Sequence, residues 1–273
     1  MQKKQKKIRR YIFRSLKNLK RFCVSLLLNK VENMSWKKNK LYFTWQSIIY
    51  AKSWQHFVEI HTYKKDWLSS FAPMRNSVKD ELPWISFKAQ GILRDLVSPN
   101  FKIFEFGGGG STLFFCQLAE HVVTVEDSEN WFNKLKEFVR IKNISNWEGI
   151  WVESEKMTDA TNLSYKNPAD FVSRAKDMRG RSFEKYVRTI DRFPLNYFDL
   201  IIVDGRARPS CIHCSISHLK PGGYLVVDNT EREYYLAPFL NIIQNEFDIV
   251  FDDRYPTPYT PDFTKTTILR KKG

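Results

Sequence analysis

Cysteine and long hydrophobic runs are both scarce in this chain of 273 residues. Its four cysteines, Cys23, Cys116, Cys211 and Cys214, are too few for a disulfide framework, so we expect free thiols in a reducing compartment. The longest apolar run, Phe22 to Leu28, is about a third of the ~20 residues that span a bilayer, and it lacks a small-residue cleavage signature. These absences argue against a secreted disulfide-rich protein and a membrane-spanning one, and they favour a cytoplasmic protein.

Acidic residues are nearly absent from the first 40 positions, where Glu32 is alone among fourteen Lys and Arg residues. The remaining 233 residues carry 30 basic and 29 acidic side chains, so almost the whole net charge of +14 lies in the N-terminal segment. A charge confined to one segment says little about what the rest of the chain binds. We therefore expect no nucleic-acid partner.

The basic N-terminal segment also has a helical pattern of apolar residues. These residues recur at spacings of three and four, at Ile8, Ile12, Leu16, Leu19, Cys23, Leu26 and Leu27. The pattern predicts a basic amphipathic helix within an arm of residues 1–40, and residues 1–30 are suited to an anionic membrane surface. The protein would then lie peripherally on the inner face of the membrane. A solvated extension and a helix docked on a partner protein remain alternatives.

The rest of the chain divides into a helical segment and an α/β core. Residues 41–100 are rich in tryptophan and are expected to form short helices ahead of the core. Residues 101–273 alternate apolar strands with helical segments, which predicts a mostly parallel sheet with helices on both faces. Strands are expected at 101–106, 121–125, 149–152, 198–203 and 224–227, followed by a hairpin of 247–251 with 266–269. Residues 154–192 interrupt this rhythm, and we expect them to form an inserted lid with one or two helices.

Acidic residues stand at the ends of five successive predicted strands, where open α/β sheets bind their ligands. These residues are Glu105, Glu126-Asp127, Glu153, Asp204 and Asp228-Asn229. Four glycines, Gly107 to Gly110, follow Glu105 and would let backbone amides approach a ligand closely. A helix that starts near Ser111 would favour a carboxylate there. An acid at the end of the second strand can accept hydrogen bonds from ribose hydroxyls.

A nicotinamide-binding loop is the competing interpretation of the glycines, because G-x-G-x-x-G occupies the same place in dinucleotide-binding folds. Thr112 stands at the third glycine position, where glycine normally allows close packing of helix on strand. Glu105, two residues before Gly107, is also atypical of a dinucleotide site. Both features disfavour the nicotinamide interpretation.

The sequence from residue 83 to 270 resembles class I S-adenosylmethionine-dependent methyltransferases, particularly bacterial enzymes found among glycan and secondary-metabolite genes. The resemblance rests on four segments: E-x-G-x-G-x-S-T at 105–112, the strand end Val125-Glu126, FDLIIVDG at 198–205 and LKPGGYL at 219–225. It implies a Rossmann-like, seven-stranded sheet with the last strand antiparallel and S-adenosylmethionine as cofactor. Cofactor contacts are then expected from Glu105, Gly107, Gly109, Ser111, Thr112 and Glu126, with Glu153 on the adenine side.

A second, partial resemblance concerns a metal. Asp204 with Asp228 and Asn229 is similar to the metal-binding triad of catechol-type and sugar O-methyltransferases, and three such oxygen ligands suit Mg²⁺. The ion would lower the pKa of a substrate hydroxyl. These enzymes usually have lysine three residues after the first aspartate, whereas this chain has Ala207. In the alternative interpretation Asp204 is a general base, and Asp228 and Asn229 only cap a helix.

Candidate substrate residues follow the fourth strand and lie in the insertion. Arg206 and Arg208 could bind a phosphate or carboxylate of the acceptor, or could simply be solvated. Tyr186 is a candidate for the lid, with Arg179, Arg181 and Arg188. A zinc site of Cys211, Cys214 and His218 is disfavoured because it lacks a fourth ligand.

The function we expect is methyl transfer from S-adenosylmethionine to a hydroxyl oxygen of a sugar, glycan or other small acceptor, free or lipid-linked, with Asp204 as the base or metal ligand. An NAD(P)-dependent oxidoreductase and a non-catalytic membrane-associated protein are the alternatives. The sequence does not indicate the oligomeric state.

Overall fold

The computed structural model describes residues 36–159 and 162–273. The predicted amphipathic helix therefore lies outside the described residues. The chain forms two units, Met1–Trp45 and Gln46–Gly273. Helix α2 (Trp36–Tyr50) begins in the first unit, and all elements named below belong to the second. Among the described residues, every helix is too short or too polar to cross a membrane.

Short helices precede the sheet, and side-chain caps explain where several of them begin. The Ser53 hydroxyl accepts a hydrogen bond from the His56 amide. Asn76 and Ser86 cap the helices that begin at Ser77 and Phe87 in the same way, through the amides of Lys79 and Ala89. Such caps satisfy amides that have no partner within the helix. The helices are α3 (Trp54–Thr62), α4 (Lys64–Ser69), α5 (Ser77–Asp80) and α6 (Phe87–Leu96).

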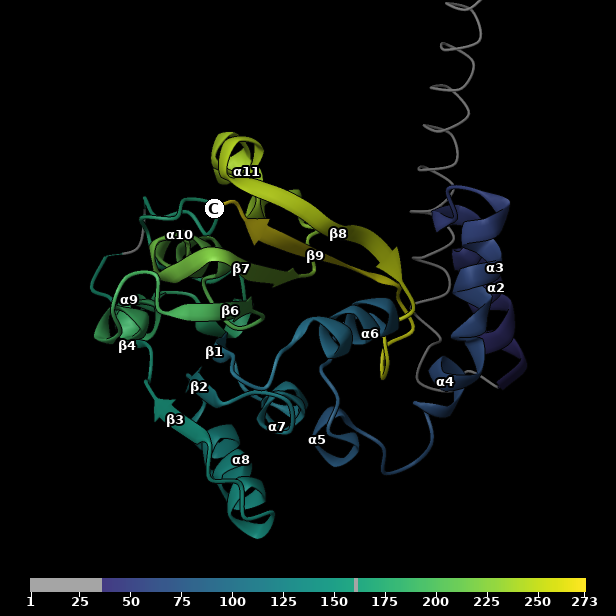
Figure 1. Cartoon of the computed structure of the whole chain (residues 1–273), viewed down its shortest axis with the longest axis horizontal. Helices are drawn as coiled ribbons and strands as arrows, with labels where there is room; N and C mark the ends of the chain where they lie inside the picture. Colours follow the sequence, from purple (N-terminus) through teal and green to yellow (C-terminus); the bar gives the residue numbers. More distant parts are fainter. Residues whose placement is uncertain (1–35, 160–161) are drawn as a thin grey trace, which may run out of the picture. The chain divides into compact units, whose positions relative to one another are not determined.

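A seven-stranded sheet forms the centre of the second unit, in the order β3-β2-β1-β6-β7-β9-β8 (Figure 1). All neighbouring strands are parallel except β9, which is antiparallel to both β7 and β8. This confirms the predicted fold class and the predicted closing hairpin. The strands are β1 (Lys102–Phe106), β2 (His121–Glu126), β3 (Trp147–Trp151), β6 (Phe198–Val203), β7 (Leu219–Asp228), β8 (Phe247–Tyr255) and β9 (Thr264–Lys271).

Helices cover both faces of the sheet, because alternate residues of each buried strand point to opposite faces. Ile103 of β1 packs in one core cluster with Leu93 of α6 and Phe114 of α7. The next residue, Phe104, packs in the other cluster with α9 and α10. The helices after β1 are α7 (Gly110–Cys116), α8 (Glu129–Ile141), α9 (Glu184–Val187), α10 (Arg208–His218) and α11 (Leu240–Glu246).

The described part of the insertion at 154–192 contains one short α-helix and two 3-10 helices, where one or two helices were expected. Its described residues form a two-stranded sheet of β4 (Glu155–Lys156) and β5 (Arg181–Ser182), then α9 and the 3-10 helices η2 (Lys176–Met178) and η3 (Arg188–Arg192). Two further 3-10 helices, η4 (Glu233–Tyr235) and η5 (Ala237–Phe239), follow β7. The parallel strands bring the ends of β1, β2, β6 and β7 to one edge of the sheet, where the predicted site residues lie.

Candidate functional site

The glycine loop turns sharply after β1 and passes close to the end of β6. Gly107 has a φ of +90°, and a Cβ there would lie 2.8 Å from the Cα of Gly205. Glycine is therefore required by both backbone conformation and space. Gly109 differs, because its backbone is extended and the nearest atom to an added Cβ is a Trp131 ring carbon at 3.9 Å. Gly109 is buried, but it leaves room for a small side-chain atom.

Glu105 and Thr112 lie beneath this loop, and both are fully buried. The Thr112 hydroxyl donates to Glu105 Oε2 at 2.5 Å and accepts from the Gly109 amide at 3.1 Å. Thr124 donates to the same carboxylate oxygen at 3.0 Å. Burial raises the pKa of Glu105 to about 7, opposed by the nearby hydroxyls. Glu105 and Thr112 therefore support the glycine loop. Their contact with the cofactor stays a prediction.

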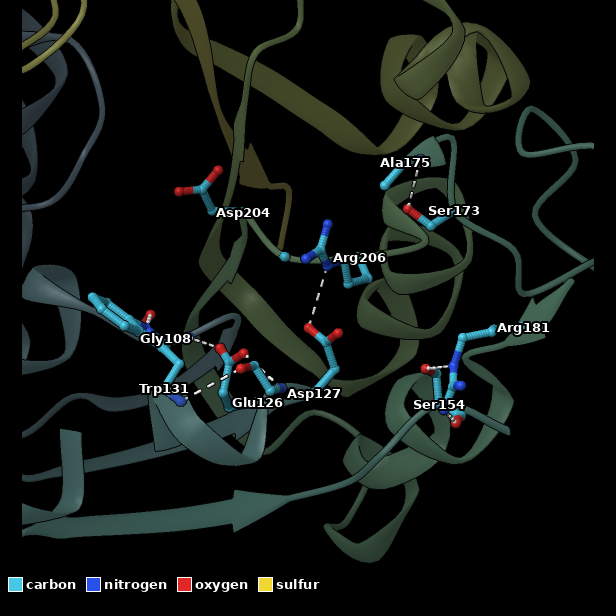
Figure 2. Close-up of polar contacts among 12 residues, drawn as sticks. Gly108, Glu126, Asp127, Trp131, Ser154, Ser173, Ala175, Arg181, Asp204 and Arg206 are labelled. Carbon is cyan, nitrogen blue, oxygen red and sulfur yellow. Dashed lines mark hydrogen bonds and ion pairs between the residues drawn. The ribbon is translucent and has the colours of Figure 1, made fainter. Parts of the chain in front are cut away.

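Glu126, at the end of β2, is hydrogen-bonded to the glycine loop (Figure 2). Its carboxylate accepts hydrogen bonds from the amides of Gly108 and Ser128, both at 3.0 Å. The Trp131 indole donates to the Gly108 carbonyl at 2.7 Å. Burial raises the pKa of Glu126, while the two amide hydrogen bonds lower it. Glu126 therefore fixes the loop and keeps unused lone pairs for a ligand.

A cavity of about 470 Å³ opens above the loop and the strand ends. Predicted residues that line it are Gly107, Gly109, Ser111, Glu126, Asp204, Arg206 and Arg208. Further lining residues that the sequence did not single out are Ser77, Trp84, Ser128 and Trp131. Ser128 and Trp131 could have been found from the rule that ligands contact the segment after a strand end. Ser77 and Trp84 come from the helical segment before the sheet, and no local signal marks them.

The strand ends of β6 and β7 are joined by Arg208, whose side chain is only 10% exposed. Its Nη2 lies 2.8 Å from Asp204 Oδ1 and donates to the Asp204 carbonyl at 2.7 Å. Its Nη1 donates to the Asp228 carbonyl at 2.6 Å and to Asn229 Oδ1 at 3.3 Å. The guanidinium thus lies among the three residues of the predicted metal triad.

The Mg²⁺ prediction is therefore not supported. A guanidinium already supplies positive charge to these oxygens, and a second cation beside it would be repelled. No cluster of three or more His, Cys, Asp or Glu side chains suited to a metal occurs in 36–159 and 162–273. The Asp228 carboxylate also accepts a hydrogen bond from Thr266 at 2.7 Å. The residues present do not fit a divalent ion.

The two aspartates differ in their surroundings. Asp228 is 2% exposed, and burial together with the charge of Asp204 raises its pKa to about 8. The Asp204 side chain is 31% exposed and borders the cavity. Burial raises the pKa of Asp204 too, but Arg208 and Arg232 oppose the shift. Asp204 is accordingly the carboxylate that a ligand in the cavity can reach.

Arg206 extends from the loop after β6 to Asp127, with 3.3 Å between Nε and Oδ1 (Figure 2). Tyr186, predicted to contact substrate, is instead 1% exposed in the core, where a Cβ on Gly205 would collide with its hydroxyl. Tyr186 is not among the residues that line the cavity, and its contact with a substrate stays a prediction. Glu153 is exposed, pairs with Arg181 at 2.9 Å and is not among the residues that line the cavity.

Comparison with known proteins bears on the fold. A scan against protein-family models and a search of curated proteins give no match. Among solved structures, the chain is similar to the O-methyltransferase from Bacillus cereus in complex with SAH, with a TM-score of 0.51 and 15% identity over 78% of this chain and 100% of that one. It is also similar to an rRNA methylase from Streptococcus thermophilus, with a TM-score of 0.44 and 16% identity over 68% and 95%. The likeness to the first structure shows that the chain has the fold of class I S-adenosylmethionine-dependent methyltransferases, as the sequence predicted.

Proposed function

We propose that this chain transfers the methyl group of S-adenosylmethionine to a hydroxyl oxygen of a small, sugar-like acceptor. The observation that carries the proposal is one cavity that is lined by the glycine loop, by Glu126 and by Asp204. The B. cereus O-methyltransferase, crystallised with SAH, has the same fold and supports this choice of cofactor.

The residues around the cavity fit the parts of this cofactor. Gly109 lines the cavity without a side chain, and an added Cβ there would have no neighbour closer than 3.9 Å, so a ligand could lie close to its backbone. Glu126 stands at the end of the second strand with lone pairs free for ribose hydroxyls. Trp131 borders the same cavity with an aromatic ring that is 36% exposed. When bound, S-adenosylmethionine supplies a methyl group already activated by its positively charged sulfur.

Asp204 is the residue we assign to removing the acceptor proton. Its Oδ1 is held by Arg208 at 2.8 Å, and within the described part of the chain no donor is bonded to Oδ2. The raised pKa makes this carboxylate a better proton acceptor than an ordinary aspartate. Arg208 fixes the orientation of Asp204, so that the free oxygen stays directed at the cavity. Alignment and proton removal are the main tasks left to a methyltransferase, because its donor is already activated.

A nicotinamide oxidoreductase is the second candidate, and the surroundings of Thr112 weigh against it. The third glycine of a dinucleotide loop leaves room for close packing of helix on strand. Here the Thr112 side chain fills that place and is bonded to Glu105. A non-catalytic membrane-associated protein, the third candidate, would have no need of the reachable carboxylate of Asp204.

The test is calorimetric titration of the full chain with S-adenosylhomocysteine and, separately, with NADH. We expect heat with S-adenosylhomocysteine only. Gly109→Ala should fold normally, because an added Cβ has room, yet bind S-adenosylhomocysteine about tenfold or more weakly, because the methyl group would occupy ligand space. Gly91→Ala is the matched control: Gly91 lies on α6 with nothing within 4 Å of an added Cβ. Absence of S-adenosylhomocysteine binding by the unmodified chain would refute the proposal.

A second measurement examines Asp204. Label transferred from radioactive S-adenosylmethionine to small molecules of a cell extract reports turnover before the acceptor is identified. Asp204→Asn should reduce this transfer by roughly a hundredfold or more, the range for a general base, while S-adenosylhomocysteine affinity stays within about twofold. Transfer at the rate of the unmodified chain would exclude Asp204 as the base.

A further inference from the structure

A second cavity lies next to the first and shares part of its wall. Its volume is about 480 Å³, and Gly205, Arg206 and Arg208 line both cavities. Figure 2 shows Ser173 and Ala175, which line the second cavity, on the opposite side of Arg206 from Trp131 and Glu126. A molecule in the second cavity would therefore lie beside the proposed cofactor site, with Asp204 near the shared wall.

The lining of this second cavity carries charge of one sign. Arginine and lysine contribute five side chains, and no aspartate or glutamate of the described chain lines it. Two of the five have carboxylate partners: Arg206 pairs with Asp127 and Arg208 with Asp204. For the other three, Arg174, Lys176 and Arg232, the described ranges contain no carboxylate within ion-pair distance. Within the described residues, the cavity thus holds three cations without a close carboxylate partner, although Arg232 is near enough to Asp204 to lower its pKa.

Tyrosines hold the unneutralised arginines in place. The Arg232 Nη1 donates to the Tyr235 hydroxyl at 2.8 Å, and its guanidinium lies 5.8 Å from the centre of that ring. Arg174 lies over the Tyr165 ring at 6.0 Å. Tyr165 and Tyr235 each pack edge-on against Tyr234, at 5.1 and 4.7 Å between ring centres. Neutral rings position the cations without cancelling their charge, so the arginines are oriented before a ligand arrives.

We propose that the second cavity binds a phosphate group of the acceptor, through Arg174, Lys176 and Arg232. This inference rests on the proposed function, since it places the acceptor next to the methyl donor. Three free cations match a phosphate dianion better than a singly charged carboxylate, and arginine binds phosphate with two parallel hydrogen bonds. The tyrosines offer flat faces for the sugar-like part of the molecule.

A small phosphorylated molecule fits better than a nucleic-acid strand. The cavity has the volume of a pocket for a small molecule. Outside residues 1–40 the chain carries 30 basic and 29 acidic side chains, whereas proteins that follow a phosphate backbone bring many cations to one surface. The same phosphate chemistry could belong to a sugar phosphate or to free phosphate, and the experiment separates the two.

The test uses the full chain with saturating S-adenosylhomocysteine, so that the first cavity is filled. Calorimetry then measures binding of glucose 6-phosphate, inorganic phosphate, glucuronate and a single-stranded RNA oligonucleotide. We expect glucose 6-phosphate to bind more tightly than inorganic phosphate, and both more tightly than glucuronate. The double variant Arg174→Gln with Arg232→Gln should bind glucose 6-phosphate about tenfold or more weakly, since each arginine contributes a charge-assisted hydrogen bond. Its affinity for S-adenosylhomocysteine should be unchanged.

Arg140→Gln is the matched control, because Arg140 is an exposed arginine on α8 that pairs with Glu137 and lines neither cavity. The phosphate proposal is overturned if glucose 6-phosphate does not bind, if the double variant binds it as well as the control, or if glucuronate binds equally well. Tighter binding of RNA than of glucose 6-phosphate overturns the assignment to a small acceptor. Failure to bind S-adenosylhomocysteine is a separate result, which refutes the proposed function itself.

Discussion

At the scale of single residues, the ionisation of the Asp228 carboxyl group is linked to folding, because this group is buried in the folded chain. Its ordinary pKa is 3.8, and in the folded chain it is about 8. At a pH between these two values, the Asp228 carboxyl group therefore keeps its proton in the folded chain and has lost it in the unfolded chain. Linkage then requires that this group's contribution to stability, fully present below pH 4, is lost as the pH rises to about 8.

Replacing Asp228 with asparagine tests this relation. Asp228→Asn keeps an oxygen that can accept from Thr266 and removes the ionisation. Urea unfolding gives the free energy of unfolding at about pH 5.5 and about pH 8.5. Between these pH values the unmodified chain should lose more of this free energy than the variant, by at most about 1.4 kcal/mol per pH unit. Asp248→Asn, at an exposed position on β8, should leave the pH dependence unchanged. If the unfolding free energy changed with pH equally in Asp228→Asn and in the unmodified chain, the raised pKa of Asp228 would be contradicted.

At the scale of secondary-structure elements, Arg208 connects the ends of β6 and β7. It donates to the carbonyls of Asp204, Gly205 and Asp228, which end these strands or follow them. Arg208→Met would leave those carbonyls and the Asp204 carboxylate without their partner. We expect the unfolding free energy to fall by about 3 kcal/mol, as measured by urea unfolding, because one member of a mostly buried ion pair is removed.

Two comparisons sharpen this prediction. Arg188→Met removes an exposed arginine that pairs with Glu184 on α9, and should cost less than about 1 kcal/mol. Neither MgCl2 nor EDTA should change the unfolding midpoint of the unmodified chain, because the guanidinium lies where the metal was expected. A midpoint that rises with MgCl2 and falls with EDTA would restore the metal interpretation.

At the scale of the whole molecule, the N-terminal arm differs from the α/β core in its charge. Residues 1–40 hold fourteen of the 44 basic residues and a single acid. We propose that this arm binds anionic lipid, which would concentrate the enzyme near an acceptor that is linked to the membrane. Sedimentation of the full chain with vesicles tests the proposal.

Neutralising three charges of the arm gives the informative variant. Lys17→Gln, Lys20→Gln and Arg21→Gln together should weaken binding to phosphatidylglycerol vesicles about a hundredfold, since each basic residue contributes about 1 kcal/mol at an anionic surface. S-adenosylhomocysteine affinity should not change. Lys134→Gln with Lys136→Gln, on α8 of the core, is the matched control. Equal binding to phosphatidylcholine vesicles, or no effect of the arm variant, would argue for the solvated or partner-bound alternatives.

The sequence by itself determined the sheet and the glycine loop, because their signals are local. The apolar run Leu200 to Val203 is followed by an acidic residue and a glycine, and β6 has the predicted bounds. In contrast, β7 begins at Leu219, five residues before its predicted start. Local sequence patterns predicted the wrong structure where a residue is hydrogen-bonded to another that lies far away in the sequence. The pattern Thr230-x-x-Glu233 is typical of a capping box that opens a helix. In the structure the Thr230 hydroxyl is instead hydrogen-bonded to Thr267 of β9, and a 3-10 helix begins at Glu233 without a side-chain cap.

Only the tertiary structure decided what the strand-end residues do. The burial of Glu105 under the glycine loop and its hydrogen bond to Thr112 are visible only in the fold. Arg208 reads as a loop arginine, but contacts with residues up to 21 positions away place it within the predicted metal triad. The second cavity combines the segments 165–176 and 232–235, whose proximity no spacing in the sequence reveals. Burial and charge pairing depend on which segments meet in space, and that is a property of the folded chain alone.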